Sequence, residues 1–181
     1  MDFNEFKELA KKRESCRDFD PEREVEIEKI EACLETMKLA PSACNAQPYY
    51  YYLVHGDEAK NLSKYFQLGK MNSFTKDAAA FAIVTEENYN LSAKIGSSVK
   101  NQDYKSIDIG ISAAYFTAEA TSLGLSTCII GWFDEEKLQK FLKTKSKIRL
   151  VIAMGYAKND DLREKKRKTS DALYKIISED K

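Results

Sequence analysis

The stretch from Ile107 to Leu123 constrains the fold more than any other part of the sequence, because it combines helical spacing with many small side chains. One face recurs every three or four residues, as in an α-helix, and consists of Ile107, Ile111, Ala114, Tyr115, Ala118 and Ser122. Further small residues keep the helix slim, namely Gly110, Ala113, Thr117, Ala120 and Thr121. We predict a central helix that packs closely on several sides and ends at Gly124.

Short apolar runs and further helical patterns alternate around this helix. Strands are predicted over Tyr49–Val54, Ala79–Thr85, Ser126–Ile130 and Arg149–Tyr156. Helices are predicted from Asp2 to near Arg13, from after Pro21 through Met37, over Glu58–Phe66 and over Glu135–Leu142. Residues 69–77 and 86–106 are polar and irregular, which indicates loops or mobile short helices. The alternation, without repeats or a linker, predicts one domain over residues 1–181 with an α+β or α/β sandwich.

Charge and composition argue against several classes of protein. The 29 basic and 29 acidic side chains cancel, so nothing indicates a nucleic-acid or anionic-membrane partner. No apolar run approaches the roughly 20 residues that cross a bilayer, and the N-terminus is too polar for a signal-peptide core. The four cysteines lie far apart, without the spacing of a metal site. We therefore expect a cytoplasmic protein with reduced thiols and no metal.

Most familiar catalytic constellations are missing from the sequence. His55 is the only histidine, it follows a predicted strand in a turn, and no GxSxG motif accompanies it. The glycines form neither a GxxxxGK[ST] phosphate loop nor a GxGxxG dinucleotide fingerprint. The remaining possibility is chemistry that a bound cofactor supplies and the protein orients.

Two basic segments are candidates for binding a phosphate. Arg13, Ser15 and Arg17 alternate, so in an extended loop they project to the same side. A distant cluster could close on the same anion, and it consists of Arg163, Lys165, Lys166, Arg167 and Lys168. Taken alone, either segment is better explained as an exposed, solvated charged surface.

The loop PSACNAQ at residues 41–47 offers amides and a hydroxyl between two prolines. Such groups can read a ring that alternates donors and acceptors, as the pyrimidine edge of a flavin does. The alternative is a helix-to-strand connection in which Asn45 and Gln47 satisfy backbone groups.

The C-terminal segment of about 158–181 is polar at first and then carries four apolar residues, Leu173, Tyr174, Ile176 and Ile177. Apolar side chains on a segment that leaves the core need another surface to cover them. We expect this arm to pack on a second subunit.

Four motifs in order carry a family resemblance. They are RESCRDF at residues 13–19, APSACNAQP at 40–48, the helix from Asp108-Ile109-Gly110 to LGLSTCIIG at 123–131, and RLVIAMGY at 149–156. In this order and spacing the chain resembles the nitroreductase family of flavoproteins, from about Arg13 to Tyr174.

The resemblance implies a three-layer α+β sandwich, with a mixed or antiparallel sheet between helices, in an intertwined homodimer that holds two FMN molecules. It assigns the FMN phosphate and ribityl end to Arg13, Glu14, Ser15, Arg17, Lys165 and Arg167. It assigns the partner subunit's contribution to Pro41, Ser42, Ala43, Asn45 and Gln47. It places Ile129, Ile130 and Gly131 beside the flavin N5 edge, and Asn72 at a further polar contact.

Three departures from the family pattern qualify these assignments. Glu14 replaces a residue that is often basic or histidine, which changes the charge near the phosphate. Ile130 stands where some relatives have an acidic residue, which makes the N5 environment less polar. The chain has little sequence between Phe66 and Asp103 to build a lid, so substrate selectivity does not carry over.

The expected reaction is ping-pong hydride transfer from NADH or NADPH, through FMN, to a nitroaromatic, quinone or similar acceptor. No side-chain acid or base is obligatory in it. Tyr49, Phe74, Tyr104 and Trp132 are candidates for the acceptor pocket or, equally, for the core. The main alternative is a flavin-binding or redox-sensing module without robust turnover. A nucleic-acid contact through REKKRK is disfavoured by the neutral net charge.

Overall fold

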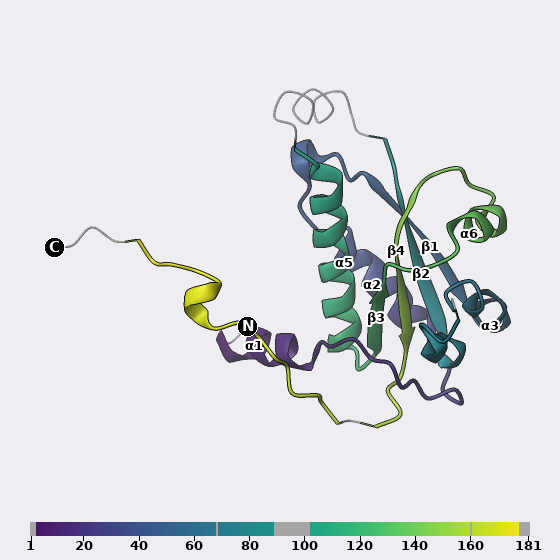
Figure 1. Cartoon of the computed structure of the whole chain (residues 1–181), viewed down its shortest axis with the longest axis horizontal. Coiled ribbons are helices and arrows are strands. Elements are labelled where there is room, and N and C mark those ends of the chain that lie inside the picture. Colours follow the sequence, from purple (N-terminus) through teal and green to yellow (C-terminus); the bar gives the residue numbers. More distant parts are fainter. Residues whose placement is uncertain (1–2, 68, 89–101, 160, 178–181) are drawn as a thin grey trace.

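A four-stranded antiparallel sheet forms the centre of the protein (Figure 1). The computed structural model describes residues 3–67, 69–88, 102–159 and 161–177. The strand order is β1-β2-β4-β3, with β1 at Tyr49–His55, β2 at Ala80–Glu86, β3 at Ser126–Ile130 and β4 at Ile148–Gly155. Each predicted strand is confirmed to within one residue at either end, because each is a short apolar run bounded by turn-forming residues.

Strand β2 is buried on both of its faces, which explains its continuous apolar sequence AFAIVT. It pairs with β1 on one side and β4 on the other, with Phe81 opposite both Val54 and Ala153. A register shift between Val84 and Thr85 interrupts the pairing with β4. The sheet is therefore covered by helices on both sides.

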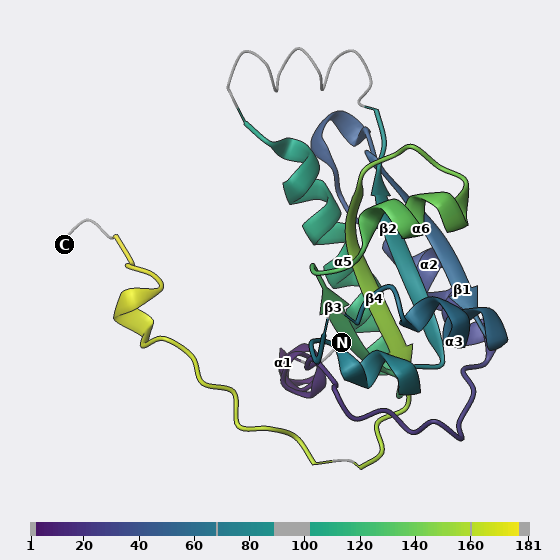
Figure 2. The ribbon, with the colours of Figure 1, turned by 45° about the vertical axis from the view of Figure 1, so that its right-hand side comes forward.

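One layer of helices consists of α2 (Ile27–Met37) and α5 (Tyr104–Ser122). Ile30 and Cys33 of α2 and Phe116 of α5 are buried in one cluster with side chains of β2 and β4. The other layer contains α3 (Asp57–Ser63), the 3-10 turn η2 (Ser73–Asp77) and α6 (Glu135–Leu142). Leu62 and Leu138 pack there with Phe66, Phe81 and Val151. Figure 2 shows these layers on opposite faces, so the predicted three-layer α+β sandwich is confirmed.

Helix α5 buries one face against the rest of the chain and leaves another face open. The sheet and α2 cover Asp108, Ile109, Ser112, Ala113, Phe116, Thr117 and Ala120. The face built on Ile107 and Tyr115 points away from them, and both of these side chains are exposed in the single chain. The helical spacing predicted this stripe but not which surface covers it.

The helix boundaries differ from the prediction in places. Helix α5 begins at Tyr104, three residues early, where the Asp103 carboxylate accepts a hydrogen bond from Ser106 N–H. Helix α2 begins at Ile27 and not directly after Pro21. The predicted irregular region 86–106 lies largely outside the described residues, and its end belongs to α5.

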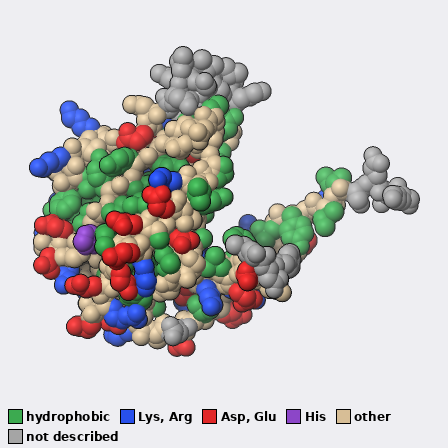
Figure 3. Space-filling view, turned by 180° about the vertical axis from the view of Figure 1, so that it is seen from behind, with side chains coloured by type: hydrophobic (Ala, Val, Ile, Leu, Met, Phe, Trp, Pro, Cys, Tyr) green, Lys and Arg blue, Asp and Glu red, His purple; other side chains and the backbone are tan. Residues whose placement is uncertain are grey.

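The C-terminal segment leaves the body of the protein after β4 (Figure 1). Its short turn η3 (Ser170–Ala172) and the apolar residues around it project away from the sheet, as the space-filling view also shows (Figure 3). Ile176 is 81% and Ile177 89% exposed. Among the described helices, none combines the length and apolarity that a bilayer crossing needs.

Candidate functional site

The loop at residues 13–17 is held in an extended conformation beside strand β3. Helix α1 (Phe3–Lys12) ends just before it. Ser15 forms a parallel bridge with Thr127, and Cys16 N–H donates to the Thr127 carbonyl oxygen at 2.9 Å. Further along, Asp20 N–H donates to the Tyr156 carbonyl oxygen at 2.9 Å. Because the segment is extended, the alternating residues Arg13, Ser15 and Arg17 lie on the same side of it, as predicted.

The basic part of the C-terminal segment lies against this loop, as predicted from the charge of both segments. Together they line a hollow of about 320 Å³, which we call the cationic hollow and which consists of Arg13, Glu14, Ser15, Arg17, Arg163, Glu164, Lys165, Lys166 and Arg167. Six of these nine residues are Lys or Arg and two are Glu. The hollow therefore carries an excess of positive charge that favours an anion.

Lys165 fixes the tail to the end of helix α1. Its ammonium donates to the carbonyl oxygens of Ala10 at 3.1 Å and Arg13 at 2.8 Å, and also to that of Lys11. An ammonium has three donors, so all are used, and Lys165 offers an anion its charge but not a free N–H. Burial, and then the neighbouring charge of Arg13, lowers the pKa of Lys165.

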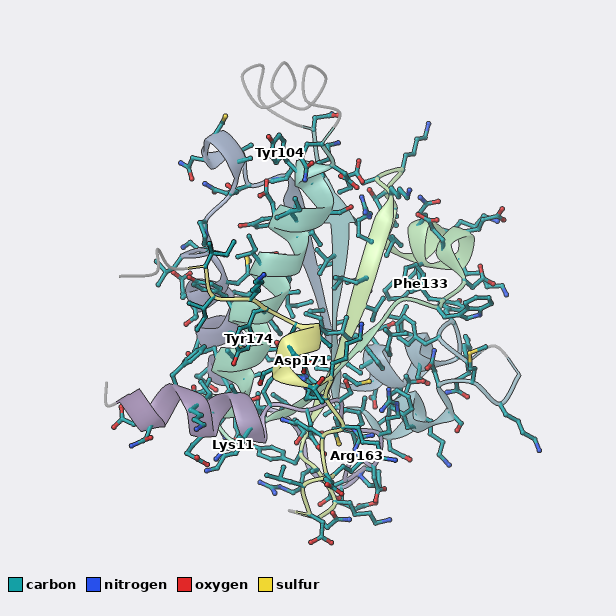
Figure 4. The ribbon with its side chains drawn as sticks, turned by 60° about the vertical axis from the view of Figure 1, so that its left-hand side comes forward. Lys11, Tyr104, Phe133, Arg163, Asp171 and Tyr174 are labelled. Atoms are coloured by element: carbon teal, nitrogen blue, oxygen red, sulfur yellow. The ribbon has the colours of Figure 1, made fainter. Side chains whose placement is uncertain are left out.

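Arg163 and Glu14 form a second connection between the tail and the loop. The Arg163 guanidinium donates to the Ser15 carbonyl oxygen at 2.7 Å, and its Nε lies 3.7 Å from the Glu14 carboxylate. Glu14 also accepts a bond from Arg163 N–H at 3.3 Å. Figure 4 shows Arg163 at the same end of the protein as Lys11 of α1. The guanidinium of Arg13 makes no hydrogen bond to any described residue, so its donors face the hollow unused.

The loop at 41–47 is an irregular turn with η1 (Ala43–Asn45) at its centre. Gln47 Nε2 donates to Asn45 Oδ1 at 2.6 Å, and Gln47 N–H donates to Ser42 Oγ at 3.0 Å. Within one chain the amides thus satisfy each other, as the alternative interpretation of a simple connection allowed. Ala43 N–H donates to both carboxylate oxygens of Asp108, at 3.1 and 3.2 Å.

The loop at 41–47 and the cationic hollow do not meet within one chain. The loop is bonded to the first turns of α5, whereas residues 13–17 lie beside the strand that follows the end of α5. A helix of 19 residues is about 28 Å long. In Figure 4, Tyr104 at the start of α5 lies at the opposite end from Lys11 and Arg163. Within one chain the loop and the hollow are therefore separate.

The end of strand β3 is the third predicted region. Ile129 is 43% exposed, whereas Ile130 is 4% exposed and packs in the core, so only the backbone of Ile130 can face a ligand. A Cβ on Gly131 would meet no atom of the described part of the chain within 4 Å, which leaves open space there. Asn72, at a positive φ of 56°, donates from Nδ2 to the carbonyl oxygens of Phe66 and Trp132, both at 3.2 Å. Asn72 thus ties its turn to the segment after Gly131.

Two features of the site were not predicted from the sequence. The Glu14–Arg163 pair joins residues too far apart for spacing to reveal. Asp108 was named only as part of a motif. An acidic residue on the buried side of a helix rich in small residues is rare enough to indicate a specific role. Within the described residues, no group of three or more His, Cys, Asp or Glu side chains is arranged to hold a metal ion.

Comparisons with known proteins agree on one family. A family model described as "Nitroreductase family" matches residues 10–156. An oxygen-insensitive NADPH nitroreductase of Helicobacter acinonychis is 26% identical over 185 residues, which cover 82% of this chain and 86% of that protein. A solved nitroreductase-like protein of Streptococcus mutans, 17% identical, superposes with a TM-score of 0.81 and covers 98% of this chain and 100% of its own. An FMN-dependent nitroreductase of Clostridium difficile, 25% identical, has a TM-score of 0.68 and covers 95% of this chain and 98% of its own.

Proposed function

Because this chain belongs to the nitroreductase family, we propose that it is an FMN-dependent oxidoreductase that uses NADH or NADPH to reduce a nitroaromatic, quinone or similar acceptor. The observation that carries the proposal is the cationic hollow, which offers the charge and the donors that a phosphate monoester requires. The relatives described as an NADPH nitroreductase and as an FMN-dependent nitroreductase support the choice of cofactors.

The residues of the hollow fit a phosphate group. The unused donors of Arg13 and the guanidinium of Arg17 would bind its oxygens, while Lys165 would contribute charge. The lowered pKa of Lys165 reports burial among like charges, and an anion relieves that crowding. Arg167, whose guanidinium contacts only the Lys166 carbonyl oxygen at 3.0 Å among the described residues, would close the hollow from the tail.

The flavin ring would extend from the hollow along strand β3. From Thr127, beside Ser15, to Gly131 the strand and its end cover about 13 Å at the usual rise per residue. The open space at Gly131 leaves room for a ring, and the backbone N–H groups of Ile130 and Gly131 are the candidate donors to N5. Asn72 would add a polar contact there.

When bound, FMN supplies the redox chemistry, accepting hydride from NAD(P)H and releasing it to the acceptor in a ping-pong cycle. The chain's own residues bind and orient it, and none has to act as an acid or base. The position of His55 agrees with this, because it ends β1, at the far edge of the sheet from β3.

The proposal includes a homodimer in which each FMN contacts both chains. Three observations support it: the loop at 41–47 and the cationic hollow lie at opposite ends of α5, the Ile107–Tyr115 face of α5 is exposed, and the arm carries exposed apolar residues. A second copy would bring Pro41, Ser42, Ala43, Asn45 and Gln47 to the other chain's hollow and would cover the arm of about 158–181. A cytoplasmic location completes the proposal, in keeping with the free thiols at all four cysteines.

The phosphate assignment is tested by comparing FMN with riboflavin, which has the same ring but no phosphate. We expect FMN to bind at least 100-fold more tightly, because a phosphate in the cationic hollow would gain several charge-assisted hydrogen bonds worth ~1.5–3 kcal/mol each. Isothermal titration of the apoprotein measures both constants. Equal affinities for FMN and riboflavin would show that the hollow is not part of the flavin site.

A further inference from the structure

The loop at 41–47 is strained. Cys44, Asn45 and Gln47 have φ angles of 51°, 51° and 44°, in the left-handed region that non-glycine residues rarely adopt. Strain of this kind persists only where the surroundings hold it. The strained residues include two of those assigned to the flavin ring.

The bonds inside the loop preserve its shape but do not fix its place. Asn45 N–H donates to the Ser42 carbonyl oxygen at 3.0 Å, and Ala46 N–H donates to that of Ala43 at 3.0 Å. These partners move together with the loop. A bond from another element is needed to set where the loop lies relative to the rest of the protein.

Asp108 of α5 supplies such a bond. Its side chain is 3% exposed, and both of its carboxylate oxygens lie within 3.2 Å of Ala43 N, the residue at which η1 begins. Burying a carboxylate such as that of Asp108 is costly unless its partners compensate. A second buried polar atom, Tyr49 Oη, has no hydrogen-bond partner among the described residues. Burial raises the pKa of Tyr49, and the charge of Asp108 raises it further. A costly buried charge whose one N–H partner among the described residues lies on a strained loop indicates a role for that bond beyond stability.

We propose that Asp108 is a positioning residue for the flavin ring, because its carboxylate holds Ala43 N–H and thereby places the loop that carries Ser42, Asn45 and Gln47. This inference rests on the proposed function, in which these groups reach the flavin of the partner chain. Asp108 does not touch the flavin itself. Its helix also bears the exposed Ile107–Tyr115 face, so the carboxylate ties the loop to the surface that would meet the partner.

The direct test measures hydrogen exchange at Ala43 N–H in the apoprotein. We expect Asp108→Ala to speed exchange at Ala43 by at least tenfold, and Asp108→Asn, which keeps the shape and one acceptor oxygen, to have a smaller effect. Ser112→Ala is the matched control, because it removes a buried hydrogen bond on the next turn of the same face, 2.9 Å from Tyr51 Oη, without contacting the loop. Unchanged exchange in Asp108→Ala would overturn the inference.

The second readout is the environment of the bound ring. In Asp108→Ala and in Asp108→Asn we expect weaker riboflavin binding, by about tenfold and threefold, and a shift in the absorption maxima and reduction potential of bound FMN, with neither change in Ser112→Ala. If exchange at Ala43 rises while riboflavin affinity, spectrum and potential stay at their wild-type values, Asp108 is structural and the inference is wrong. That outcome leaves the proposed function intact, whereas failure of the wild-type protein to bind FMN would refute the proposed function itself.

Discussion

The ammonium of Lys165 lies 2.8 Å from the carbonyl oxygen of Arg13, although 152 positions separate the two residues in the sequence. The same ammonium also binds carbonyl oxygens at the end of α1, where a helix carries partial negative charge. One cation therefore ends the helix, anchors the tail and adds charge to the cationic hollow.

Replacing Lys165 should affect the tail and the cofactor together. We expect Lys165→Ala to weaken FMN binding by roughly 10- to 100-fold, since bonds to a charged group are worth about 1.5–3 kcal/mol. The control is Lys166→Ala, which removes the same charge from a side chain without a hydrogen bond to the described residues, and we expect a loss below about threefold. Fluorescence titration measures both, and equal losses would contradict the anchoring role.

Glu14 lowers the positive charge of the hollow and holds Arg163. We expect Glu14→Gln to tighten FMN binding by roughly three- to tenfold at low salt, because a nearby charge at effective dielectric constants typical of protein surfaces contributes about 1 kcal/mol or more. The gain should shrink as salt rises. Weaker binding by Glu14→Gln would show instead that its contact with Arg163 dominates.

A substitution at Gly131 distinguishes an effect on ligand binding from an effect on folding. A Cβ there would meet no atom of the described residues within 4 Å, so Gly131→Ala should leave the melting temperature of the apoprotein unchanged. We expect at least a tenfold loss of FMN affinity, because the methyl group would occupy space assigned to the ring. If Gly131→Ala binds FMN with wild-type affinity, the flavin ring does not lie at the end of β3.

The exposed face of α5 tests the dimer. We expect Tyr115→Arg to produce a folded monomer that does not retain FMN, since a buried charge at the interface has no partner and the loop at 41–47 would then be lost from the site. Lys140→Glu on α6, on the opposite face of the sheet, should stay dimeric. Light scattering with circular dichroism distinguishes the two, and a Tyr115→Arg dimer that retains FMN would contradict this interface.

Acid stability should depend on Glu26. Its pKa is lowered to about 2, first because Tyr156 Oη donates to it at 2.6 Å and also because Lys29 lies 3.3 Å away. In the unfolded chain the carboxyl has its ordinary pKa of 4.5, so its stabilisation is complete above that pH and is lost as the pH falls toward 2.

Urea unfolding between pH 7 and pH 2.5 measures this dependence. We expect Glu26→Gln to be less stable than the wild type at pH 7, with a difference that shrinks below pH 4.5. Tyr156→Phe, which removes the donor, should lose the same pH-dependent component. A constant difference across this range would refute the assignment.

The helices and strands could be predicted from the sequence, but the contacts between them could not. Strand β3 and helix α6 were predicted at their observed ends, because turn residues bound short, clear patterns. The spacing predicted the stripe on α5 but not that it is open, since Tyr115 and Ile107 look the same in sequence whether a sheet or another chain covers them. The bond from Ala43 to Asp108 spans 65 positions, and no local pattern encodes it. The grouping of residues 13–17 with the basic tail came from their charge, which suits one anion, and the structure brings these residues together.

The most direct test of the central claim is the absorbance of the purified protein between 300 and 550 nm, recorded before and after anaerobic addition of NADH and of NADPH. The account predicts flavin bands from FMN, present as purified or after reconstitution, that bleach with at least one of the two reductants and return when a quinone or nitroaromatic acceptor is added. A flavin that binds but is not reduced would leave only a flavin-binding module, and a protein that cannot be loaded with FMN would contradict the claim.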